Sequence, residues 1–157
     1  MGRPDLEASI PPGARLTIDT SAILAYLDGT ERVSGLAAAV VDRLVAPGRN
    51  AALISAISVT ETLVRPIRSG SAGAIALVET FLAAFPNLSI APVTYAVARE
   101  AARIRATTAL RTPDAIVLST ALVGGHEIVV ANDERWAPAI ERASLNLQLV
   151  HLEAFLE

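Results

Sequence analysis

The sequence predicts a single α/β domain, built as a parallel sheet of about five strands flanked by helices. Short aliphatic segments alternate with longer helical patterns along the 157-residue chain, and this alternation is typical of parallel sheets. The segment at 128–130 is continuously apolar, as expected for a strand that is buried on both faces. A chain of this length forms one domain with a sizeable core. We expect the domain at 15–157, after a flexible leader at 1–14.

The first half of the chain predicts three strands separated by helices. The strands are short aliphatic runs at 15–18, 51–54 and 88–91. The helices are expected at 22–27, 31–45, 58–65 and 72–84. Thr30 can cap the second of these helices, and Ser58 and Glu61 have the spacing of a capping box that would open the third. Pro66 is expected to bend or end that third helix.

The second half continues the alternation. Thr94 can cap a helix at 95–109, and Thr112-Pro113 predicts the start of another that ends at Gly124-Gly125. Two strands are expected at 127–131 and 147–150, separated by a short helix at 138–143. A helical turn is expected from Leu152 onward.

Four acidic residues are expected to converge at one edge of this sheet: Asp19, Glu61, Asp114 and Asp133. Asp19 and Asp133 directly follow predicted strands, and the carboxyl ends of parallel strands border the crevice in which open α/β sheets bind ligands. Glu61 and Asp114 are predicted in the first turns of helices that can reach this crevice. Because the four residues come from four separate segments, their convergence would require the complete fold.

Each acid also has a purely structural interpretation. Glu61 could complete a capping box, Asp114 could interact favourably with a helix dipole, and Asp133 could cap a turn. Asp19 is harder to explain in this way, because burying a carboxylate after a strand is costly unless it is paired. The one nearby cation is Arg15, and the chain contains no Lys.

Clustered carboxylates suit Mg²⁺ or Mn²⁺, because these ions prefer oxygen ligands. Two such ions can activate a water molecule and stabilise the leaving oxygen in phosphodiester cleavage. Other chemistries lack their residues: there is no Cys and no Gly-rich phosphate loop with Lys. Ser21 stands where a haloacid-dehalogenase-like site would have a second Asp. His126 and His151 lack metal-ligand spacing and are interpreted as surface or strand-end residues.

Four segments resemble the acidic motifs of PIN-domain ribonucleases: Ile18-Asp19-Thr20-Ser21-Ala22, Ile57-Ser58-Val59-Thr60-Glu61, Thr112-Pro113-Asp114-Ala115-Ile116 and Val130-Ala131-Asn132-Asp133. Their order and spacing agree with the family over residues 15–150, and the compact size is similar to that of VapC-type toxins. The resemblance implies a Mg²⁺- or Mn²⁺-dependent endoribonuclease that acts as a homodimer. It also implies a cognate antitoxin that inserts a segment into the active-site groove.

By position, the resemblance implies catalytic and metal-binding roles for the four acids, supported by the polar residues Ser21 and Asn132. Ala131 departs from the pattern, because many relatives have Thr there. With no Lys in the chain, RNA phosphates must be contacted by Arg. Arg111 is the first candidate because it lies three residues before Asp114, and Arg65 and Arg68 follow. Alternatively, these arginines are solvated or pair with Glu.

Three functional classes stay open: a catalytic ribonuclease toxin, a non-catalytic PIN-like binding module in a complex, and a nuclease that acts on DNA. Four repelling carboxylates favour catalysis, because a binding module has no reason to keep them. The net charge of −3 gives no overall basic signature, although a local patch could bind nucleic acid. The hydrophobic fraction of 52% predicts a covered surface, in a homodimer through 31–45 or 72–84 or in the antitoxin groove. The absence of Cys and of a membrane or signal segment is consistent with a cytoplasmic location.

Overall fold

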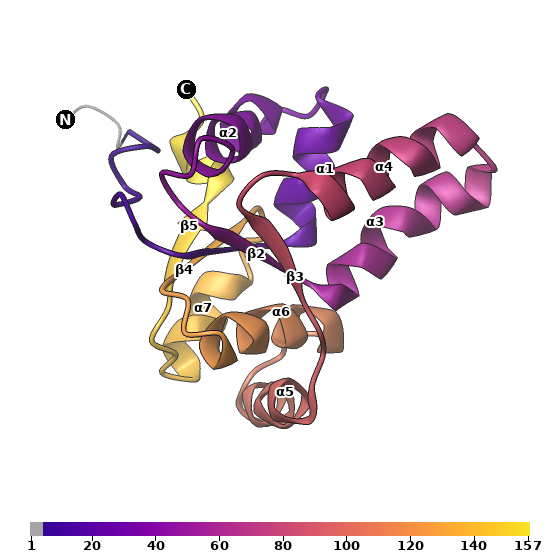
Figure 1. The fold of residues 1–157 in the computed structure, drawn as a ribbon. Helices are drawn as coiled ribbons and strands as arrows, with labels where there is room; N and C mark the ends of the chain where they lie inside the picture. The colour runs from indigo at the N-terminus through magenta and orange to yellow at the C-terminus, as the bar shows by residue number, and fades with distance from the viewer. Residues whose placement is uncertain (1–4) are drawn as a thin grey trace.

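The computed structural model describes residues 5–157, and its strands form one sheet in the order β3-β2-β1-β4-β5 (Figure 1). The strands are β1 (Leu16–Ile18), β2 (Ala52–Ser55), β3 (Leu88–Ala91), β4 (Ile128–Ala131) and β5 (Gln148–His151). All four neighbouring pairs are parallel. The five-stranded parallel sheet predicted from the sequence is therefore confirmed, and each strand boundary lies within one residue of the expected position.

Helices cover both faces of the sheet, with α1 and α2 on one side and α5, α6 and α7 on the other (Figure 1). The helices are α1 (Thr20–Asp28), α2 (Ser34–Ala38), a π-helical segment (Ala39–Val45), α3 (Ala56–Ser69), α4 (Ala72–Ala84), α5 (Tyr95–Thr107), α6 (Thr112–Val123), α7 (Trp136–Arg142) and a 3₁₀ turn (Leu152–Phe155). The α3–α4 pair extends beyond the sheet as a helical hairpin.

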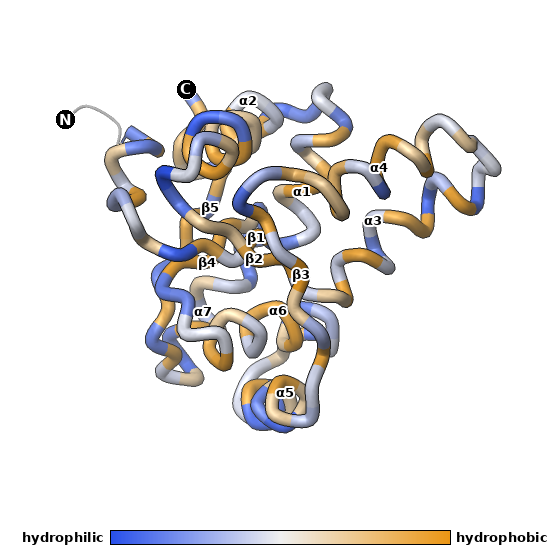
Figure 2. The backbone as a smooth tube through the Cα atoms, in the orientation of Figure 1, coloured by the Kyte–Doolittle hydropathy of each residue, from blue (hydrophilic) through white to orange (hydrophobic). Residues whose placement is uncertain are grey.

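Strand β4, next to the central strand β1, contributes side chains to two separate hydrophobic cores. Ile128 and Val130 belong to the core beneath α1 and α2, whereas Val129 and Ala131 belong to the core beneath α6 and α7. This arrangement follows from the alternation of side chains along a strand. It explains why the segment is continuously apolar in the sequence. Helix α5, in contrast, is amphipathic: Figure 2 shows hydrophobic and hydrophilic residues on different sides of it.

The segment expected to be a leader contributes to the first core in its described part, residues 5–14. Leu6 and Ile10 are buried there. The Asn50 amide donates hydrogen bonds to the carbonyls of Pro11 and Ala14 at 2.9 and 2.8 Å. Residues 1–4 lie outside the described residues. Within 5–157, none of the helices combines the length and the hydrophobicity that crossing a membrane requires.

The predicted start and end of the third helix are wrong. Helix α3 begins at Ala56, with Ser55 as its N-cap accepting from the Ile57 amide at 3.3 Å. Ser58 is therefore inside the helix, and the expected Ser58–Glu61 capping box does not form. The helix also continues through Pro66 to Ser69. A proline removes one backbone hydrogen bond, and the packing of α3 along α4 offsets that loss.

The predicted helix at 31–45 is also different in the structure. Thr30 does not cap it, because the Thr30 amide and hydroxyl both donate to the Asp28 carboxylate. The chain instead turns until Ser34, whose hydroxyl donates to the Ala25 carbonyl at 2.6 Å and accepts from the Glu31 amide at 3.0 Å. Helix α2 begins at this anchored serine and continues into the π-helical segment.

Candidate active site

Asp19 lies at the carboxyl end of the central strand β1, where it is the N-cap of α1. Its backbone amide donates to the Val130 carbonyl of the neighbouring β4 at 2.9 Å. The chain crosses from β1 toward β2 and β3 on one side, and β4 and β5 lie on the other. Asp19 therefore borders the point at which the strand order reverses, which is the ligand-binding crevice of open α/β sheets.

The Asp19 carboxylate is buried, with only 7% of the residue exposed. Its Oδ2 accepts hydrogen bonds from the Ser21 hydroxyl at 2.6 Å and from the Ser21 amide at 3.1 Å. Burial, with a smaller contribution from the nearby Asp114 carboxylate, raises the pKa of Asp19 to about 6 in spite of these hydrogen bonds. Asp114 is equally buried, in the first turn of α6. The fold thus brings two predicted acids together at the expense of mutual repulsion.

Arg135, which was not predicted, joins two of the acids. Its guanidinium donates to Asp133, with Nε 2.9 Å from Oδ1, and its Nη2 lies 3.7 Å from Oδ2 of Asp114. The hydrogen bond from Arg135 holds the pKa of Asp133 below its usual value. Arg111 contacts the same Asp114 oxygen, at 3.3 Å. Both arginine side chains are more than half exposed, whereas the Asp114 side chain that they contact is largely buried.

The sequence did contain a local signal for Arg135. Asp133 accepts a hydrogen bond from the Arg135 backbone amide at 2.9 Å, so the two residues form a tight turn before α7. A side chain two residues after such an Asp is held close to its carboxylate. Asp133 therefore stabilises a turn, as its structural interpretation predicted, and also lies at the carboxyl edge of the sheet.

Glu61 reaches the site through Thr20 rather than from a helix start. It is the sixth residue of α3 instead of lying in the first turn, which corrects the prediction. Its Oε1 accepts a hydrogen bond from the Thr20 hydroxyl at 2.8 Å, and that hydroxyl also lies 2.8 Å from Oγ of Ser58. Because one hydroxyl has one proton, Thr20 donates to Glu61 and accepts from Ser58. Thr20 and Ser58 were not predicted as site residues, and only their places within the acidic motifs pointed to them.

Ser21 and Asn132 connect the two strand ends that border the site. The Ser21 hydroxyl accepts a hydrogen bond from the backbone N–H of Asn132 at 2.9 Å while it donates to Asp19. The Asn132 side chain in turn accepts from the Glu153 amide at 3.1 Å, which fixes the C-terminal 3₁₀ turn against the loop. These contacts position Asp19 relative to β4.

Arg65 and Arg68 lie on a different surface from Arg111. They line a groove between α1, α3 and α4 with a volume of about 610 Å³. Leu24, Leu27 and Leu77 form its apolar walls. Hydrogen bonds from Thr30, with a smaller contribution from the charge of Arg65, lower the pKa of the exposed Asp28. Of the three predicted arginines, only Arg111 contacts a site acid among the described residues.

The donor set at the sheet edge fits a small divalent cation. Within residues 5–157, no three His, Asp or Glu side chains lie close enough to share one metal ion. Mg²⁺, however, is usually held by one or two carboxylates together with water and substrate phosphate. Asp19 and Asp114 provide two buried carboxylates whose repulsion a cation would relieve.

The fold resembles several solved structures at low sequence identity. FitAcB from Neisseria gonorrhoeae matches with a TM-score of 0.67 and 18% identity, over 88% of this chain and 98% of that chain. VapC20 of Mycobacterium tuberculosis, described as a toxin that cleaves the sarcin–ricin loop, matches with a TM-score of 0.63 and 19% identity, over 79% and 94%. A toxin–antitoxin complex from Klebsiella pneumoniae gives 0.62 and 20%, over 87% and 97%.

The sequence itself gives a direct assignment. No curated protein sequence matches the chain significantly. A family model described as the PIN domain matches residues 16–141, which include β1 to β4 and all four predicted acids. The resemblance inferred from the acidic motifs is therefore confirmed, and this chain belongs to the PIN-domain family.

Proposed function

We propose that the protein is a Mg²⁺- or Mn²⁺-dependent endoribonuclease toxin that cleaves RNA phosphodiester bonds and is neutralised by a cognate antitoxin. The observation that supports this best is the pair of buried carboxylates, Asp19 and Asp114, at the carboxyl edge of the sheet. Burying two repelling acids costs stability, and a catalytic metal site is a physical reason to retain them.

In this proposal Asp19 and Asp114 hold the metal ion, and Glu61 and Asp133 complete the acidic site. The chemistry that a divalent ion would supply there is activation of a water molecule and stabilisation of negative charge on the phosphate. Ser21 keeps Asp19 oriented through its hydroxyl, and Thr20 does the same for Glu61. Arg111 is more than half exposed beside Asp114 and can offer its guanidinium to a phosphate oxygen.

Two apolar surfaces support the proposed partners. The groove between α1, α3 and α4 suits an inserted antitoxin segment, because its leucine walls are bordered by Arg65 and Arg68. The outer face of α3 exposes Val64 and Ile67, by 43% and 59%, and suits a second copy of the chain. The helical segment at 34–45 contributes mainly to the core, so it is not proposed as an interface. Sedimentation of the isolated chain at high micromolar concentration as a monomer would contradict the homodimer.

The function is tested by incubating a panel of structured RNAs with the protein, with and without Mn²⁺, beside the Asp19→Asn variant. We expect cleavage at defined positions that requires the ion and is lost in Asp19→Asn. A DNA panel of matching sequence tests the alternative substrate. If the metal binds but no nucleic acid is cut, the non-catalytic binding module becomes the better description.

A further inference from the structure

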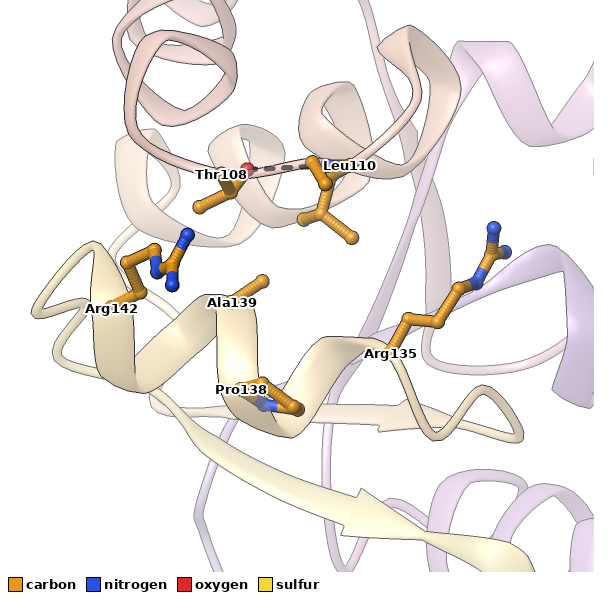
Figure 3. A pocket seen from close by; sticks show the side chains of 7 residues that line it. Thr108, Leu110, Arg135, Pro138, Ala139 and Arg142 are labelled. Atoms are coloured by element: carbon orange, nitrogen blue, oxygen red, sulfur yellow. Dashed lines mark hydrogen bonds between the residues drawn. The ribbon is translucent and has the colours of Figure 1, made fainter.

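A small pocket beside the acidic site has the composition of a nucleobase subsite. It lies between the α5–α6 loop and α7, with a volume of about 290 Å³. Leu110, Pro138 and Ala139 provide its apolar walls. Figure 3 shows Arg135 and Arg142 at opposite ends, with Leu110 and Ala139 between them. The size is at the lower end of ligand sites, which are roughly 300–1,000 Å³, and suits one flat ring.

The pocket adjoins the acids through a shared residue. Arg135 lines the pocket and also contacts Asp133 and Asp114. The neighbouring loop is held by Arg105, which donates to the Leu110 carbonyl at 3.1 Å and to the Thr112 hydroxyl at 2.9 Å. A nucleotide bound at the acids would therefore have its neighbour within reach of this pocket.

The charge around the pocket complements a nucleotide. Four arginines border the loop and α7, namely Arg105, Arg111, Arg135 and Arg142, although the chain as a whole has a net charge of −3. Arg142 is exposed and forms no ion pair with any residue in 5–157. Guanidinium planes stack on unpaired RNA bases, and the same groups bind phosphate.

We infer that this pocket receives an unstacked base of the RNA strand, next to the phosphodiester that is cut. Arg142 stacks on the base, and Leu110, Pro138 and Ala139 surround its edges. This inference rests on the proposed ribonuclease function and adds a position at which the substrate is recognised. An acidic peptide is the competing occupant, but it would leave the apolar walls between the two arginines unused.

The test is RNA binding measured in EDTA, so that it does not depend on cleavage. A fluorescent single-stranded oligoribonucleotide is compared with versions in which one position at a time is abasic. We expect one abasic position to weaken binding by about tenfold in the wild-type protein, since stacking of a base contributes on that order. Ala139→Leu fills the pocket and should remove this difference. Ala137→Leu, an exposed residue on the same helix outside the pocket, should preserve it.

Two substitutions of the exposed Arg142 provide evidence even if Ala139→Leu fails to fold. Arg142→Ala should lose the base effect and lower the slope of log affinity against log salt by about one. Arg142→Lys should have the same salt slope as the wild type but should still lack the effect of the abasic position, because Lys keeps the charge but not the planar group.

The inference is overturned if no abasic position matters, or if Arg142→Lys keeps the full base effect. It is also overturned if Ala139→Leu abolishes binding of an oligoglutamate peptide but leaves the effect of the abasic position on RNA binding unchanged. Cleavage without any base effect would reject the pocket alone. A base effect in a protein that cuts no RNA would reject the nuclease function alone.

Discussion

The guanidinium of Arg135 lies 3.7 Å from the buried carboxylate of Asp114, although Arg135 precedes α7 and Asp114 lies in the first turn of α6. This arginine provides positive charge at the edge of the acidic site. It also holds Asp133, so a metal ion that uses Asp133 must compete with it.

Replacing Arg135 by Gln should strengthen metal binding. Exposed ion pairs contribute roughly 0.2–1 kcal/mol, so the Mn²⁺ dissociation constant should fall by about 1.4- to fivefold. The fluorescence of the single Trp136, which is buried next to Arg135, provides the titration signal. Arg99→Gln on α5 is the matched control and should leave the constant unchanged. Weaker Mn²⁺ binding in Arg135→Gln would show that the arginine supports the site rather than competing for it.

Asp19→Asn should stabilise the metal-free protein at neutral pH. The folded-state pKa of Asp19 is about 6 against an ordinary value of 3.8, so the native state binds more protons than the unfolded state between these pH values. The wild-type protein therefore loses stability as pH rises from 4 to 6, and the Asn variant does not. The advantage of the variant should grow from near zero at pH 4 to as much as about 3 kcal/mol at pH 7.5.

Urea denaturation in EDTA at these two pH values measures the effect. Asp28→Asn is the control, because the pKa of the exposed Asp28 is lowered by its hydrogen bonds to Thr30, so its replacement should not stabilise the protein at neutral pH. An Asp19→Asn protein that is less stable than the wild type at pH 7.5 would identify Asp19 as a structural acid.

Divalent ions should raise the unfolding temperature through Asp19 and Asp114. At a hundredfold excess over the dissociation constant, binding to the native state stabilises by about 2.7 kcal/mol. For a domain of this size the midpoint should rise by roughly 5–10 °C. Differential scanning fluorimetry with Mn²⁺ or Mg²⁺ should show this shift in the wild type and a smaller one in Asp114→Asn. If EDTA leaves the midpoint of the Mn²⁺-treated protein unchanged, the two acids do not bind the ion.

Thr20→Val should reduce catalysis more than it disturbs the fold. The substitution removes the hydroxyl that positions Glu61 and leaves Ser58 without its partner. Leaving a buried polar group unpaired costs about 1–3 kcal/mol, and a displaced catalytic group costs on the order of 10–100-fold in rate. We expect kcat to fall while KM changes little, and Thr20→Ser to recover most of the rate. Full activity in Thr20→Val would remove Glu61 from the catalytic group.

The sequence by itself determined the parallel sheet and the edge of it that carries the acidic residues. The alternation of short aliphatic runs with helical patterns specified five parallel strands, and the polar residues after 18 and 131 specified which ends would bear Asp19 and Asp133. These features are local, because side-chain periodicity and turn residues act over a few positions. The family assignment also followed from the motifs, since order and spacing are properties of the chain.

Only the tertiary structure decided how the acids are paired. Ser55 rather than Ser58 caps α3, because two serines three positions apart can each serve as the cap and only the packed fold draws Ser58 toward Thr20. Arg135 at the N-terminus of α7 contacts Asp114 in the first turn of α6, and no local rule relates those positions. The burial that raises the pKa of Asp19 likewise exists only once both helical layers cover the sheet. Long-range contacts are set by how whole elements pack, so the sequence could place the acids near each other but could not assign their partners.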